Sequence, residues 1–280
     1  MKQLPTRFKT LLPTLLLLLT GAVIAMVLLR QCSDHRRNLM LGSAADIPSG
    51  GDTIDVAIDF SPVSYYAEGD SISGFNYEML RMISSSTGLP VKFHPLTSLD
   101  EALAGLSSGI YDLVAADIPV ILEYKDQFLF TEPVYLDRQV VVEHRDPQGN
   151  DNSSLISSQL DLGHKHVWVV SDSPSENRLR NLASEIGDTI FIHSNPDYSA
   201  ELLFLMTSIG EIDYCVINER VANALAEKDG TAAIAANISF TQFQAWALRL
   251  DSEPLKTRID SAIIAIKNSG TYHRLTEKYL

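Results

Sequence analysis

Two stretches of the chain repeat the same order of hydrophobic and polar positions. Each begins with apolar residues at helical spacing and then reaches a glycine, Gly109 in the first stretch and Gly210 in the second. A short apolar run follows and ends at a polar residue, Asp117 or Asn218. This order predicts a helix stopped by glycine and then a buried strand of a parallel sheet. Because ligands bind beyond the carboxyl ends of such strands, the repeat predicts two α/β lobes whose polar residues face a shared cleft.

The rest of the chain alternates between the same two kinds of element. Strands are predicted around residues 54–60, 91–93, 112–116, 140–142, 167–170, 190–192, 212–217 and 244–248. Helices are predicted after Gly74, Ser98, Ser173 and Ser199, and over the apolar positions of 221–225, 255–266 and 272–279. This order places residues 53–137 and 246–280 in one lobe and residues 138–245 in the other. Each lobe is expected to hold a mixed, mostly parallel sheet flanked by helices. The two crossings between lobes would form a hinge that permits closure around a ligand.

The first fifty residues predict a membrane anchor followed by a tether. Residues 11–29 are nearly all apolar, and nineteen helical residues span about 28 Å, close to the thickness of the hydrocarbon core. Lys2, Arg7 and Lys9 precede this run, as expected of a cytoplasmic flank. We therefore expect an uncleaved transmembrane helix over residues 1–30, a tether over residues 31–52, and a body in the periplasm at the inner membrane. A lipidated Cys32 is the alternative.

Composition narrows the classes of partner and chemistry. The chain carries a formal net charge of −13, and residues 51–280 hold 16 Lys and Arg against 33 Asp and Glu. Such an acidic body repels phosphate backbones, so nucleic acid is not expected as a partner. The chain has two cysteines, Cys32 and Cys215, and the second falls in a predicted buried strand. His164 and His166 are expected to share a strand face, but without a third ligand they do not define a metal site, and no metal or cofactor is expected.

Polar residues at strand ends and in the adjoining loops are the candidates for ligand binding. The strand-end rule selects Asp59, Asp117, Asp172 and Asn218. The adjoining loops add Ser64, Tyr65, Tyr66, Ser173 and Ser175, together with Ser61. The helix after Asp172 offers free backbone N–H groups that suit an anion or carboxylate, and the tyrosines can stack on a ligand. The alternative for each aspartate is a helix cap or turn residue, and no catalytic residue is assigned.

The order of several motifs resembles the extracytoplasmic solute-binding proteins of family 3. These motifs are residues 74–78 (GFNYE), 106–116 (LSSGIYDLVAA), 130–135 (FTEPVY) and 269–280, within a resemblance that spans residues 53–280. The resemblance implies a two-lobed periplasmic-binding-protein-like fold of type II and the binding of polar amino acids for import. Residues 61–65, 74–78 and 199–203 resemble more specifically the non-catalytic, ligand-sensing domain of membrane-bound lytic murein transglycosylase F. In those enzymes a peptidoglycan-cleaving domain follows; this sequence ends at Leu280, so no cleavage activity is expected.

The chain departs from the family at the positions that hold an amino acid. Where the family has the Thr and Arg that clamp the ligand's carboxylate, this chain has Ile121 and Tyr124. Tyrosine cannot make the bidentate charged contact of arginine, although its position makes Tyr124 a candidate binding residue. The lobe-two Asp that pairs with the ligand's ammonium is Asn218, and residues 172–174 replace the usual Gly-Ser-Thr loop. These departures favour a peptide or peptidoglycan fragment over a free α-amino acid, or no ligand at all.

Three hypotheses about function follow. The leading one is a membrane-tethered solute-binding protein that closes on a small polar, amino-acid-like or peptidic ligand and acts as a transport receptor or sensor. The second is a degenerate binding module, without activity of its own, that docks or regulates a permease or a cell-wall enzyme. The third is an enzyme that uses a cleft carboxylate, since a dehydratase is known on this fold; we expect the chain not to be an enzyme.

Overall fold

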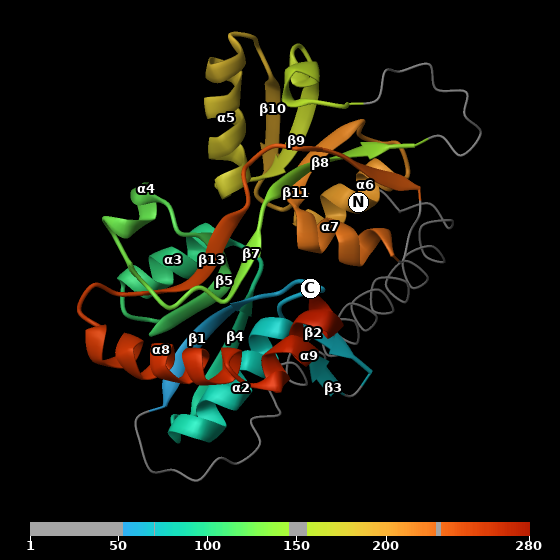
Figure 1. Ribbon diagram of the computed structural model, residues 1–280. Helices are drawn as coiled ribbons and strands as arrows, with labels where there is room; N and C mark the ends of the chain where they lie inside the picture. Colours follow the sequence, from blue (N-terminus) through green and yellow to red (C-terminus); the bar gives the residue numbers. More distant parts are fainter. Residues whose placement is uncertain (1–52, 70, 146–155, 228–230) are drawn as a thin grey trace, which may run out of the picture. The chain divides into compact units, whose positions relative to one another are not determined.

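The computed structural model describes residues 53–69, 71–145, 156–227 and 231–280 (Figure 1). By its internal contacts the chain divides into Met1–Ile47 and Pro48–Leu280, and the described residues all belong to the second unit. The predicted anchor over residues 1–30, the tether over residues 31–52 and Cys32 lie outside the described residues. Within the described ranges, no helix combines the length and the hydropathy that crossing a membrane requires.

The first lobe is built on a sheet whose strand order is β4–β1–β5–β13–β6, with β7 also paired to β13. Its strands are β1 (Ile54–Asp59), β4 (Val91–Leu96), β5 (Leu113–Pro119), β6 (Leu129–Phe130), β7 (Tyr135–Asp137) and β13 (Gln242–Leu248). β1 runs parallel to both β4 and β5, whereas β13 is antiparallel to β5. The carboxyl ends of β1 and β5 therefore lie side by side at one edge of the sheet.

Helices cover both faces of this sheet. Phe75, Leu80 and Ile263 join strand residues in the larger core, on the face that α2, α8 and α9 cover. Leu106 of α3 packs against the opposite face. The helices are α2 (Phe75–Thr87), α3 (Leu99–Ser107), α4 (Leu122–Lys125), α8 (Glu253–Lys267) and α9 (Gly270–Tyr279), and a hairpin adds β2 (Tyr66–Glu68) and β3 (Ser71–Ser73). The sheet is thus sandwiched, as its nearly continuous apolar strands require.

The second lobe repeats this plan with a sheet of order β10–β9–β11–β8–β12. Its strands are β8 (Gln139–His144), β9 (His166–Val170), β10 (Phe191–Asn195), β11 (Tyr214–Asn218) and β12 (Ala232–Asn237). Its helices are the 3₁₀ helix η1 (Gln159–Leu162), α5 (Pro174–Ile186), α6 (Ala200–Ser208) and α7 (Glu219–Ala226). β9, β10 and β11 are parallel, and β8 is antiparallel to β11. α5 packs on one face, and α6 and α7 pack on the other.

The mixed α/β architecture predicted from the sequence is confirmed, and so are the serine caps. Ser98, Ser173 and Ser199 each accept a hydrogen bond from a backbone N–H in the first turn of the helix that follows. Gly109 and Gly210 take φ angles of 79° and 74°, so the two repeated glycine stops have the left-handed conformation that glycine permits.

The boundary expected between residues 245 and 246 falls inside β13. Gln242 pairs with Asp137 and Gln244 with Tyr135, so the strand belongs to the first sheet from its first residue. The sequence predicted this strand over residues 244–248, and the structure extends it back to Gln242. The chain passes between the two sheets once after β7 and once between β12 and β13 (Figure 1).

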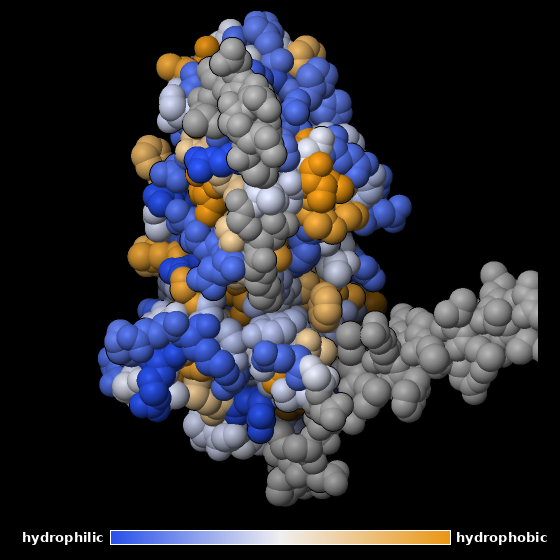
Figure 2. Space-filling model, turned by 90° about the vertical axis from the view of Figure 1, so that its right-hand side faces the viewer, coloured by the Kyte–Doolittle hydropathy of each residue, from blue (hydrophilic) through white to orange (hydrophobic). Residues whose placement is uncertain are grey.

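Hydrophilic residues dominate the face shown in Figure 2, with hydrophobic residues in separate clusters. Large apolar side chains that remain exposed in the described part include Phe240, Leu205 and Ile209. Scattered exposed apolar side chains are normal for a folded domain, so these residues alone do not indicate a binding surface.

Candidate functional site

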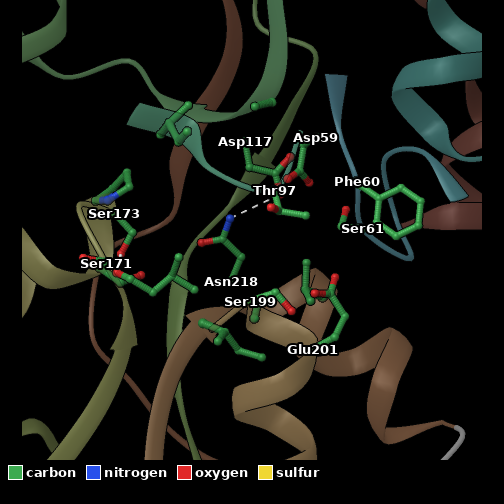
Figure 3. Close-up of a pocket in the computed structure, with 18 of the residues that line it drawn as sticks. Asp59, Phe60, Ser61, Thr97, Asp117, Ser171, Ser173, Ser199, Glu201 and Asn218 are labelled. Carbon is green, nitrogen blue, oxygen red and sulfur yellow. Dashed lines mark hydrogen bonds between the residues drawn. The ribbon is translucent and has the colours of Figure 1, made fainter. Parts of the chain in front are cut away.

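A cavity of about 120 Å³ lies where the carboxyl ends of strands from both sheets meet (Figure 3). From the first lobe it is lined by Asp59, Phe60, Ser61, Thr97, Leu99, Ala116 and Asp117. From the second lobe it is lined by Val170, Ser171, Ser173, Pro174, Ser175, Ser199, Ala200, Glu201, Val216, Ile217, Asn218 and Val221. This is the position at which ligands bind in open α/β sheets.

A hydrogen bond joins the two lobes across this cavity. Asn218 Nδ2 donates to Asp117 Oδ2 at 3.2 Å, as Figure 3 shows. The hydroxyl of Tyr135, on β7, donates to the other oxygen, Asp117 Oδ1. Asn218 ends β11 and precedes α7 without capping it through its side chain, which leaves its amide free to reach the opposite lobe. The two residues that end the repeated motifs thus meet directly.

Three carboxyl groups line the cavity: Asp59, Asp117 and Glu201. Figure 3 shows the carboxyl groups of Asp59 and Asp117 side by side. Burial, and then the charges of Asp117 and Glu201, raise the pKa of Asp59 to about 8, against the opposing hydrogen bond from Ser61. Two acids that share a desolvated site cannot both ionise cheaply, so at neutral pH the two carboxyl groups together hold at least one proton.

The pKa of Asp117 is raised to about 7, first by burial and then by the charge of Asp137. The hydrogen bond from Asn218 and the charge of Arg220 oppose this rise. Burial also raises the pKa of Asp137 to about 6. The first lobe therefore carries a row of three acids that runs from the cavity to β7, a concentration of acidic groups that is typical of functional sites.

The start of α5 forms one wall of the cavity. The Ser173 hydroxyl donates to Val170 O at 2.6 Å and accepts from Glu176 N at 3.4 Å. Pro174 is the first helical residue and has no N–H, so the backbone donor available in this turn is that of Ser175. Ser171, Ser173 and Ser175 together give this wall a neutral polar surface.

Asp172 and Tyr124 lie together in a second hollow, not in this cavity. Asp172 takes a φ of 54°, and its N–H donates to Glu176 Oε2 at 3.0 Å. The hollow, of about 410 Å³, lies between α3 and α4 of the first lobe and α5 of the second. Tyr124 on α4 packs against the core under α3, and burial raises its pKa. The left-handed turn at Asp172 redirects its side chain, which corrects the strand-end expectation for this residue.

Ser64, Tyr65 and Tyr66 do not line either hollow, which corrects the expectation drawn from the first loop. Ser64 is fully buried and accepts from Asn76 Nδ2 at 2.8 Å. Tyr65 is 1% exposed and packs edge-on to Tyr77, with ring centroids 5.5 Å apart. Tyr66 belongs to the β2–β3 hairpin. The turn after Ser61 directs this segment into the core, where its aromatic rings remove more apolar surface from water than they would in the cleft.

Several lining residues were missed from the sequence. Thr97 directly follows β4, so the strand-end rule applied to that strand would have found it. Ser199 was assigned only as a helix cap, yet it also faces the cavity, as does Glu201 in the first turn of α6 (Figure 3). No signal in the local sequence separates Glu201 from the other acids that open helices.

The histidine expectation was wrong in its geometry. His164 precedes β9 and has a φ of 60°, so it shares no strand face with His166. Its Nε2 atom lies 3.2 Å from Asp188 Oδ1. The Nδ1 atom of His166 instead lies 2.8 Å from Nε2 of His193 on the neighbouring strand, β10. In the part of the chain that the structure describes, no three His, Cys, Asp or Glu side chains gather to hold a metal.

Comparison with known proteins places this geometry in a family. The model of the bacterial extracellular solute-binding proteins, family 3, matches residues 53–280. Membrane-bound lytic murein transglycosylase F of Shewanella pealeana is 27% identical over 228 residues, which are 79% of this chain and 44% of that protein. The amino-acid-binding protein AabA of Dichelobacter nodosus is 26% identical over 224 residues, 79% of this chain and 84% of that protein. The chain thus spans less than half the length of the transglycosylase that it matches.

Solved structures agree. An ancestral arginine-binding protein bound to arginine superposes with a TM-score of 0.70 at 25% identity, over 81% of this chain and 98% of that one. A substrate-binding protein of an amino acid ABC transporter, AbpA from Streptococcus pneumoniae bound to L-arginine, gives a TM-score of 0.69 at 25% identity, over 81% and 94%. The periplasmic-binding-protein-like fold is therefore confirmed for the described residues.

Proposed function

Because the chain belongs to the bacterial extracellular solute-binding proteins of family 3, we propose that it is a membrane-tethered extracytoplasmic solute-binding protein. It closes on a small polar or peptidic ligand and acts as a transport receptor or sensor. The observation that carries this proposal is the cavity to which both lobes contribute, spanned by the hydrogen bond from Asn218 to Asp117. A ligand held by both walls binds the closed form more tightly than the open form, and this difference in affinity drives closure.

Contacts at the crossing support a hinge in this place. Arg138 follows β7 and makes a two-pronged ion pair with Glu219, at 2.9 Å from Nε and 2.5 Å from Nη2. Arg220, the next residue of α7, donates to the carbonyl of Leu136 at 2.9 Å. The start of α7 therefore ties the second lobe to the crossing segment, and Asn218 stands immediately before it. Three consecutive residues, Asn218, Glu219 and Arg220, thus connect the cavity wall to the crossing segment.

The membrane tether and the periplasmic address are part of the proposal. The apolar run of residues 11–29 has the length of a bilayer span and follows Lys2, Arg7 and Lys9. An anchor there would hold the body at the outer face of the inner membrane. A periplasmic address also agrees with the description of the family as extracellular.

A thermal-shift screen of the full-length chain tests the binding role. The screen covers amino acids, their amines, dipeptides and muropeptides. A ligand at a hundred times its Kd adds about 2.7 kcal/mol, which for a domain of this size raises Tm by roughly 5–10 °C. The Asp117→Asn variant should lose the shift, and Glu211→Gln, an exposed acid beyond the far end of α6, should keep it. If no compound in any class shifts the wild-type Tm, the binding role is refuted.

A second candidate function is a degenerate module that docks or regulates a cell-wall enzyme or a permease without activity of its own. It is favoured by the relatives named as lytic murein transglycosylases, in which the matched region is 44% of the protein from Shewanella pealeana. Surface-immobilised full-length chain should then bind a purified peptidoglycan-cleaving enzyme, with the same affinity for wild type and for Asp117→Asn. Loss of this binding in the variant would assign the interaction to the cavity and count against a separate docking role.

A further inference from the structure

We propose, as a refinement that rests on the proposed function, that the cavity takes a cation without a carboxylate: a primary amine or a guanidinium compound. The first support is the charge of the walls. Asp59, Asp117 and Glu201 line the cavity, and no Lys, Arg or His is among the described residues that line it. A ligand placed there meets three acids and no basic side chain.

The second support is that these acids lack basic partners. Within the described part of the chain, none of the three carboxyl groups forms a salt bridge, and Glu201 Oε1 is buried without a hydrogen-bond partner. Buried charges in proteins are normally paired, because removing a charge from water without a partner is costly. An ammonium or guanidinium group between the acids would supply the missing pair and several hydrogen-bond donors.

The third support is that the described cavity walls offer a ligand carboxylate only neutral hydrogen-bond donors, several of which are already engaged. Asn218 Nδ2 is already donated to Asp117, and the Ser173 hydroxyl to Val170 O. The start of α5 retains mainly the Ser175 N–H, because Pro174 has none. A ligand carboxylate there would face nearby acids without a basic side chain to neutralise it, which disfavours the zwitterionic group of a free amino acid.

The basic group that affects Asp117 is engaged elsewhere. Arg220 lowers the pKa of Asp117, but it donates to the carbonyls of Leu136 and Leu280 and lies over the ring of Tyr135, 5.5 Å from its centroid. It does not line the cavity. Its role is therefore to hold the hinge and the end of α9, and the charge inside the cavity is left for a ligand to balance.

Calorimetric titration of the full-length chain with matched pairs tests this inference. Agmatine differs from L-arginine, and cadaverine from L-lysine, only by loss of the carboxylate. At pH 7 we expect at least one amine to bind ten times more tightly than its amino acid. Asp117→Asn and Glu201→Gln should each weaken amine binding at least tenfold, whereas the matched control Glu211→Gln should leave it unchanged.

A second readout of the same titration is proton release. The groups that face Asp59 and Asp117, in addition to each other, are Glu201, Ser61, Asp137, Tyr135, Arg220 and Asn218. A bound cation favours the ionised acids, so the protons held at pH 7 are released on binding. The measured heat should therefore change with the ionisation enthalpy of the buffer, and the affinity should rise between pH 6 and pH 8. A binding heat that is the same in every buffer would overturn the inference.

The outcomes separate this inference from the proposed function. If L-arginine or L-lysine binds as tightly as its amine, or if a neutral or acidic compound is the tighter ligand, the cavity still serves a solute-binding protein and the inference is overturned. If no compound binds in calorimetry or in the thermal-shift screen, the proposed function itself is refuted. Amine binding that survives both Asp117→Asn and Glu201→Gln would assign the amine to another surface and also overturn the inference.

Discussion

Replacing Asp117 by Asn should stabilise the protein at alkaline pH when no ligand is added, although it removes a residue of the binding site. The pKa of Asp117 is 3.8 in an unfolded chain and about 7 in the fold, because burial and the charge of Asp137 disfavour its ionised form. The native state therefore holds a proton that the unfolded state has already lost. The contribution of Asp117 to wild-type stability therefore falls as the pH rises from about 4 to 7 and is level above that range.

The size of the effect follows from two opposing contributions. Each pH unit between the two pKa values costs about 1.4 kcal/mol, so the full penalty above pH 7 is on the order of 4 kcal/mol. Asparagine removes this penalty, but its amide replaces the carboxyl group in the hydrogen bonds with Tyr135 and Asn218, at a cost of about 2 kcal/mol. The Asn218 amide can turn to present its oxygen to the new amide. The net gain is then about 2 kcal/mol at pH 8 and near zero at pH 5.

Urea denaturation of the full-length chain followed by circular dichroism measures this gain. At pH 8 the Asp117→Asn variant should unfold at higher urea than wild type, and its Tm should be roughly 4–8 °C higher. At pH 5 the two proteins should be nearly equal. Glu211→Gln should stay within about 0.5 kcal/mol of wild type at both pH values. A difference between Asp117→Asn and wild type that does not change with pH would refute the assignment of a raised pKa to this carboxyl group.

Three further predictions concern the framework of the first lobe and the buried thiol of the second. Gly74→Ala should cost on the order of 3 kcal/mol or more, measured by urea denaturation, because φ is 132° and the new Cβ would lie 2.2 Å from Ser64 O. Trp246→Phe should cost about 2–3 kcal/mol in the same assay, since Trp246 is fully buried and its Nε1 donates to Asn76 Oδ1 at 3.1 Å. Burial raises the pKa of the Cys215 thiol to about 12, so peptide mapping after iodoacetamide at pH 7.5 should show alkylation of Cys215 only in unfolded protein. A free energy of unfolding equal to that of wild type in Gly74→Ala or Trp246→Phe, or rapid alkylation of Cys215 in the native protein, would contradict the packing described.

The sequence predicted the parts of the site that depend on strand ends. Asp59, Asp117 and Asn218 were expected at the cleft because each was predicted to end an apolar strand, and the structure brings all three to one cavity, although β5 continues past Asp117 to Pro119. That rule is physical: parallel strands align their carboxyl ends, whatever the loops do. The helices that begin after a serine cap were also predicted, because the cap residue and the helical spacing of apolar residues indicate the same start.

Loop geometry and short strands were not predictable in this way. Tyr65 turns inward because Val63 O accepts from Phe75 N at 2.6 Å and fixes the loop against α2, a contact between distant positions. β6 and β7 have only two and three residues, too few to show a period. β12 has the sequence AAIAAN, which is poor in the branched and aromatic residues that favour strands. These strands form because they pair with neighbouring strands of the sheet, so the local sequence does not predict them.

Hydrogen–deuterium exchange on the full-length chain, with and without saturating agmatine, tests most directly that a ligand is held between the lobes. Binding between the lobes predicts slower exchange at the carboxyl end of β5 in one lobe and at the starts of α5 and α7 in the other, and faster exchange again in Asp117→Asn at the same agmatine concentration. Protection confined to one lobe, or protection that leaves these segments unchanged, would contradict it.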